Sequence, residues 1–202
     1  MISQIPARED KDLERLFAQA RRYDLLSREQ EQEIDERKWT AVHSLLEVLI
    51  EDPFSRHYLG HWISSCGEPL PEMEKFKVRS HRSLLRRELG DYLPGGSQAP
   101  KIAALAEMFS KPCSGQQLLS HILELSLPAS LVVGMAEVVM HQADESSSSK
   151  VAAALIAWEY HWPREYADVT AVKPATIKSL MAQIRRYMKA RDLLITHNLR
   201  LV

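Results

Sequence analysis

The feature that most constrains the fold is a long helical pattern that begins at a clear capping signal. In DLLSREQEQEIDERKW, Ser27 supplies a hydroxyl at the N-cap position and Gln30, three residues later, completes a capping box. Apolar residues then recur at three- and four-residue spacings as far as Pro53, which disfavours helical geometry in the residue before it. We therefore expect a helix from about Arg28 to Ile50.

The same spacing recurs along the rest of the chain, and only seven of the 202 residues are glycine, so we expect an all-α protein. Leu13, Leu16 and Phe17 share one face of a shorter helix, which would form a hairpin with the helix that begins at Arg28. A last amphipathic helix is expected after Pro174. Shorter helices are expected in between, near residues 54–64, 76–89, 101–109, 115–125, 130–142 and 150–160.

These elements predict two lobes. The hairpin and the last helix are expected to form one lobe, in which apolar side chains of both are buried. These side chains are Leu25 and Leu26 of the hairpin and Leu199 and Leu201 of the last helix. The middle helices would form the second lobe. The corresponding segments are 8–52, 53–172 and 173–202.

The composition places the chain among ordinary globular proteins, with 45% hydrophobic and 26% charged residues. The start has no signal-peptide pattern, and no run of eighteen apolar residues occurs. Cys66 and Cys113 lie far apart without metal-ligand or redox-motif spacing, and we expect both to be buried thiols. A cytoplasmic location is therefore expected.

Catalytic motifs are not visible in the sequence. It contains neither a glycine-rich phosphate loop nor a nucleophile-elbow serine. His57 and His61 stand one turn apart, as a metal pair can, but without a third ligand or an HExxH-type glutamate, so packing beside Tyr58 and Trp62 is the favoured role. We expect no enzyme activity, cofactor, metal site or small-molecule substrate.

Positive charge is uneven although the formal net charge is only −1. The stretch KFKVRSHRSLLRR, residues 75–87, carries six basic residues and no acidic one, and residues 150–202 carry nine basic against four acidic residues. The arginines of the first stretch are candidates for contacts with a phosphate backbone. A solvated helix face is the commoner explanation of such a run and stays the favoured one. The candidates are Arg79, Arg82, Arg86 and Arg87.

Two stretches resemble a known family. Residues 12–34, DLERLFAQARRYDLLSREQEQEI, resemble region 1.2 of the bacterial sigma-70 family, and residues 198–202, NLRLV, resemble the start of region 2.1. The resemblance covers about 30 residues. It implies a subunit without chemistry of its own that binds core RNA polymerase and contacts single-stranded promoter DNA in transcription initiation. The middle of the chain would then match the family's variable, non-conserved region.

The resemblance also implies a base-binding pocket. In the family, regions 1.2 and 2.1 together hold a flipped-out thymine, the last base of the minus-ten element, and the matching positions are Glu31, Asn198 and Leu201. A carboxylate and an amide can hydrogen-bond a base edge, while a leucine packs on the ring or methyl group. Taken alone, Glu31 is equally well explained as a first-turn acid and Leu201 as a core residue.

One position departs from the family. Its members often carry a Met-Arg pair that contacts the discriminator, where this chain has Phe17 and Ala18. Arg21 and Arg22 could supply phosphate contacts or replace the missing arginine, with Phe17 or Tyr23 stacking on an unpaired base. Core packing of Phe17 and solvated arginines are the favoured explanation.

The last helical pattern has no cap, glycine or proline at Val202, and the family continues beyond this point. We therefore expect the N-terminal part of a sigma factor, as a fragment or a truncated gene product. The alternative is a sigma-derived helical interaction module that docks on RNA polymerase without reading DNA.

Overall fold

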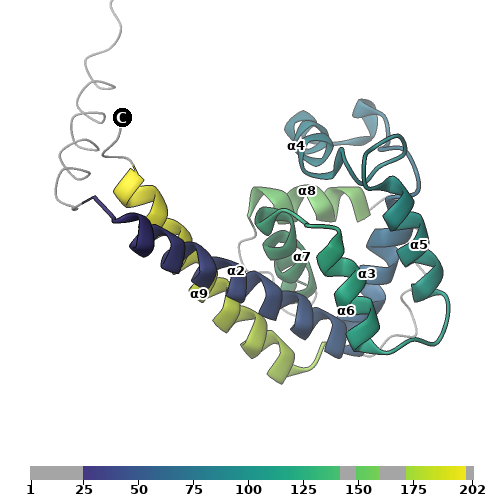
Figure 1. Cartoon of the computed structure of the whole chain (residues 1–202). Helices are drawn as coiled ribbons and strands as arrows, with labels where there is room; N and C mark the ends of the chain where they lie inside the picture. Colours follow the sequence, from purple (N-terminus) through teal and green to yellow (C-terminus); the bar gives the residue numbers. More distant parts are fainter. Residues whose placement is uncertain (1–24, 142–148, 160–171, 199–202) are drawn as a thin grey trace, which may run out of the picture. The chain divides into compact units, whose positions relative to one another are not determined.

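Figure 1 shows the computed structural model of the chain, which describes residues 25–141, 149–159 and 172–198. The regular secondary structure of these residues is entirely helical, which confirms the all-α expectation for the described part. No helix in these ranges is long and apolar enough to cross a membrane. The shorter N-terminal helix, expected around Leu13 to Phe17, lies outside the described residues.

The helices begin and end close to the expected positions. The long helix expected from Arg28 to Ile50 is confirmed, since α2 covers Arg28–Glu51. The last helix, α9, covers Pro174–Asn198. The elements between them are α3 (Pro53–Ser65), the 3-10 helix η1 (Met73–Lys75), α4 (Arg79–Leu89), α5 (Ala99–Phe109), α6 (Gly115–Glu124), α7 (Ala129–His141) and α8 (Lys150–Glu159).

One boundary was misjudged from the sequence. A helix was expected to begin at Phe76, but α4 begins at Arg79. The backbone at Phe76 and Val78 is extended, and the Phe76 side chain is buried. Packing of this ring, rather than helical periodicity, decides the local conformation, so the chain turns into the helix three residues later than expected.

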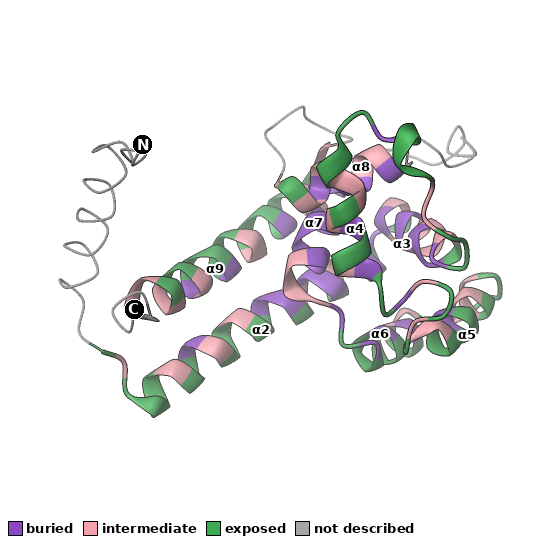
Figure 2. Ribbon diagram, turned by 90° about the horizontal axis from the view of Figure 1, so that it is seen from above, coloured by how far each residue is buried: buried purple, intermediate pink, exposed green. Residues whose placement is uncertain are grey.

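The described chain divides into two compact units. The first contains residues 25–41 and 185–198, which are the first part of α2 and the second part of α9. These two helical segments run side by side in opposite directions (Figures 1 and 2). Their buried residues include Ile34, Tyr187 and Ala190, which are spaced as inward-facing positions of an amphipathic pair.

The second unit, which contains the described residues between 42 and 184, is built around α7. Figure 2 shows α7 as buried along most of its length, and all of residues 131–136 are buried, as expected of a helix that is apolar all round. Helix α8 packs on α7 and on α4, while α5 packs on both α3 and α6. A Cβ atom on Gly134 would come within 2.7 Å of Val151 Cγ1, so glycine permits the close approach of α7 and α8.

Asp52 joins three elements of this unit. It is the N-cap of α3, where Pro53 occupies a first-turn position, and its Oδ1 accepts hydrogen bonds from Ser55 N at 3.0 Å and Ser55 Oγ at 3.1 Å. Its Oδ2 accepts a third hydrogen bond, from Thr176 Oγ1 in the first turn of α9, at 3.0 Å. The carboxylate is buried and therefore fixes the start of α9 to the junction between α2 and α3.

Candidate functional site

The site expected from the sequence begins at the capping box of α2. Ser27 N donates to Gln30 Oε1 at 2.9 Å, and Gln30 N donates to Ser27 Oγ at 3.3 Å, so both halves of the box are formed. Hydrogen bonds from backbone and from Ser27 lower the pKa of Glu29. Glu31, in the same first turn, is half-buried, and its backbone N donates to Ser27 O at 2.9 Å. The capping box thus fixes the backbone that presents Glu31.

The second part of the expected site lies at the end of α9. Asn198 is the last residue of this helix, and α9 ends beside the start of α2 (Figure 1). Glu31 and Asn198 therefore belong to turns at the same end of the helix pair in the first unit. The side chain of Asn198 and the whole of Leu201, Phe17, Arg21 and Arg22 lie outside the described residues.

Four large apolar side chains of the first unit are partly exposed. Met188 and Ile195 are 36% and 49% exposed and stand seven residues apart, on one face of α9. Leu25, which precedes α2, and Trp39 within α2 are 54% and 36% exposed. Single exposed apolar residues are ordinary, and two in register on one helix are a candidate contact face.

The four candidate arginines of α4 have different surroundings. Arg82 Nε donates to Pro71 O at 2.8 Å, so this side chain anchors the preceding loop. Arg87 Nη2 pairs with Glu88 Oε1 at 2.8 Å, and Glu88 also accepts from Ser130 Oγ. Two of the four are therefore engaged within the protein.

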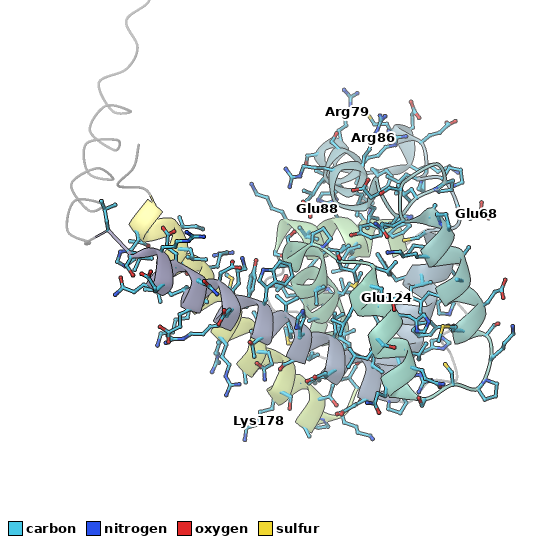
Figure 3. The ribbon with its side chains drawn as sticks, in the orientation of Figure 1. Glu68, Arg79, Arg86, Glu88, Glu124 and Lys178 are labelled. Carbon is cyan, nitrogen blue, oxygen red and sulfur yellow. The ribbon has the colours of Figure 1, made fainter. Side chains whose placement is uncertain are left out.

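Arg79 and Arg86 are the available members of this set. Both are exposed, and within the described ranges neither side chain makes a hydrogen bond or an ion pair. They are seven residues apart, hence on one face of α4, and Figure 3 shows both on the outer side of this helix. A flexible anionic chain could contact both guanidinium groups at once.

The histidine pair has a geometry that the sequence did not predict. His57 and His61 project from one face of α3, and their Nε2 atoms share a hydrogen bond of 3.1 Å. Both rings line a pocket of about 450 Å³ between α3 and α5, together with Arg56, Gly60 and Phe109 among others. The one-turn spacing was visible in the sequence, but the pocket depends on α5, more than forty residues further on.

The two cysteines differ in their surroundings. Cys66 is buried, and burial raises the pKa of its thiol, so the thiolate is strongly disfavoured. Cys113 is half-buried rather than buried, and its Sγ lies 3.3 Å from Met108 O as a hydrogen-bond donor. No group of three or more His, Cys, Asp or Glu side chains within the described ranges is placed to hold a metal ion.

Comparisons of the chain with protein-family models, with curated proteins and with solved structures find no match. The sigma-70 resemblance therefore rests on the residues of the two sequence motifs.

Proposed function

We propose that the chain is the N-terminal part of a sigma factor, which binds core RNA polymerase and contacts the single non-template strand at the end of the minus-ten element and in the discriminator. One observation supports this proposal above the others. The turn of α2 that carries Glu31 and the turn of α9 that ends in Asn198 are 167 positions apart in sequence, yet they lie at the same end of one helix pair. A pocket shared by the two motifs requires this arrangement.

The chemistry of the two side chains fits an extruded base. A carboxylate accepts hydrogen bonds and an amide both donates and accepts, so together they can read the hydrogen-bonding edge of a thymine. Arg79 and Arg86 add a separate, sequence-independent attraction for phosphates, which would fall with salt. Base contacts would supply specificity, whereas these arginines would supply affinity.

The proposal is tested by measuring binding of a labelled single-stranded minus-ten oligonucleotide to the purified chain. Asn198→Ala and Glu31→Gln should each weaken binding about ten-fold, because one good base contact contributes roughly 1–3 kcal/mol. Gln32→Ala is the matched control, since Gln32 is an exposed neighbour bonded only locally to Glu36. Equal affinities for all four proteins would overturn the proposal.

A second candidate function is favoured by the exposed apolar residues of α9. Met188 and Ile195 would suit a helical module that docks on RNA polymerase without reading DNA. In that case Met188→Ser with Ile195→Ser should abolish binding to core polymerase, while Asn198→Ala leaves it unchanged and no oligonucleotide binding is seen. The two functions are thus separated by the same set of proteins.

A further inference from the structure

We propose that His57 and His61 form a chelating site for a divalent transition-metal ion on α3. The proposal is independent of the sigma-factor function. It rests on the placement of two imidazole nitrogens in a pocket, which the capping and packing of α3 hold in place.

The two nitrogens already meet in a hydrogen bond of 3.1 Å, and we propose that a metal ion can take the place of this hydrogen bond. His57 and His61 are four residues apart and therefore share one face of the helix. Their ring centroids are 4.6 Å apart with planes inclined by 69°, and the Nε2 atoms, which are the outermost atoms of each ring able to bind a metal, are 3.1 Å apart. In this hydrogen bond one ring carries its proton on Nε2. For both Nε2 atoms to bind a metal ion, that ring must carry the proton on Nδ1 instead.

The separation agrees with bidentate coordination. Nitrogens that each lie about 2.05 Å from a metal ion and 3.1 Å from each other subtend an angle of about 100° at the metal. This angle lies between the roughly 90° of octahedral or square-planar neighbours and the roughly 109° of tetrahedral ones. A small adjustment of either ring then accommodates any of these geometries.

The helix that carries the pair is rigid. Tyr58, Leu59, Trp62 and Ile63 are all buried, and Asp52 caps the first turn of α3. The backbone of α3 is therefore fixed before a metal arrives, and little ordering of the helix opposes binding. The pair sits on the opposite side, where it lines the pocket next to α5.

The pocket can complete the coordination sphere. Its volume of about 450 Å³ holds several water molecules, each of which occupies about 30 Å³ in the liquid. Arg56, whose Nη2 donates to Cys113 O at 2.7 Å, brings a positive charge to the wall. This charge disfavours a bare cation and favours one that carries an anionic ligand such as phosphate or a carboxylate.

The donor set selects the class of metal. Two neutral imidazoles suit Cu²⁺, Ni²⁺ and Zn²⁺, whereas Mg²⁺ and Ca²⁺ prefer oxygen ligands. With only two protein ligands, the site should bind Cu²⁺ more tightly than either Ni²⁺ or Zn²⁺. Mg²⁺ should not displace any of these three ions from the site.

The test uses the full chain, freed of any affinity tag and treated with a chelator, and titrates it with Ni²⁺, Zn²⁺ or Mg²⁺ by calorimetry. His57→Gln and His61→Gln should each lower Ni²⁺ affinity by at least about ten-fold, because losing one arm removes the chelate effect. The double variant should lose little more than either single variant. His121→Gln, which removes an exposed histidine of α6, is the matched control and should bind like the unaltered chain.

Three results would overturn the site: undiminished Ni²⁺ affinity in the single variants, additive losses in the double variant, or equal response to Mg²⁺. Because a variant could misfold, the Cu²⁺ electron paramagnetic resonance spectrum of the unaltered chain gives a second readout. Hyperfine coupling to two nitrogens supports the chelate. Coupling to one nitrogen, or to none, contradicts it.

Discussion

The carboxylate of Asp52 provides a sharp test of how this fold is held together. Replacing it by alanine removes the N-cap of α3, which costs about 0.5–2 kcal/mol in other helices. It also removes the acceptor for the hydroxyls of Ser55 and Thr176. Ser55 is fully buried, so its donors would lose a charged partner, at about 1.5–3 kcal/mol for such a bond. These contributions overlap, and we expect a total loss of about 3 kcal/mol.

This loss is measured by urea unfolding, followed by far-ultraviolet circular dichroism. The matched control is Ser114→Ala, which removes the capping box of α6, an exposed cap whose hydrogen bonds to Gln117 are all local. We expect the control to lose about 1 kcal/mol. If Asp52→Ala costs no more than Ser114→Ala, the carboxylate does not link α9 to α3 as described.

The pH dependence of stability tests the same contribution of the Asp52 carboxylate. Burial alone would raise the pKa of Asp52, but the hydrogen bonds from Ser55 and Thr176 outweigh it and hold the pKa below its ordinary value. Because the pKa is lower in the folded state, the ionised carboxylate stabilises the fold at every pH above the unfolded-state pKa of about 3.9. This stabilisation is lost as the pH falls through the folded-state pKa. The difference in unfolding free energy between the unaltered chain and Asp52→Asn should thus be full at neutral pH and shrink below about pH 4. A difference that grows with acid would refute this reasoning.

Two further predictions concern packing and charge. Gly134→Ala should lower the free energy of unfolding by roughly 1–2 kcal/mol in urea, because the new methyl group meets Val151 Cγ1 at 2.7 Å. Adding Val151→Ala to this variant should recover part of the loss. Additive losses in the double variant would argue against the contact. The salt dependence of single-stranded DNA binding is measured as the slope of log K against log salt concentration. The double variant Arg79→Ala, Arg86→Ala should reduce the magnitude of this slope by roughly 1.4, since each phosphate contact contributes about 0.7. Arg87→Ala should change the slope less, because Arg87 is paired with Glu88; an equal change would show that the pairing does not matter.

Local signals in the sequence were sufficient to locate most helices. The capping box at Ser27 and the proline at position 53 fix the ends of α2, because each acts within one turn of the backbone it controls. The start of α4 was misplaced because the buried ring of Phe76, a tertiary contact, holds the preceding backbone extended. Boundaries set by packing are not encoded in the periodicity of the segment itself.

The candidate sites also combine features that are visible in the sequence with features that only the fold shows. The sequence identified the four arginines of α4 as a set, but only the fold shows that Arg82 is bonded to Pro71 O while Arg79 and Arg86 point outward. It also identified the spacing of His57 and His61 without the pocket that α5 completes. Partners distant in sequence decide which side chains are available, and a single sequence does not specify those partners.

The most direct test of the sigma-factor proposal is whether Asn198 reads the last base of the minus-ten element. Affinities are measured for oligonucleotides with thymine or an abasic residue at that position, with the unaltered chain and with Asn198→Ala. We predict that the unaltered chain prefers thymine about ten-fold and that the variant loses most of this preference, since one base contact contributes about 1–3 kcal/mol. An identical preference in both proteins, or none in the unaltered chain, would contradict the proposed base pocket.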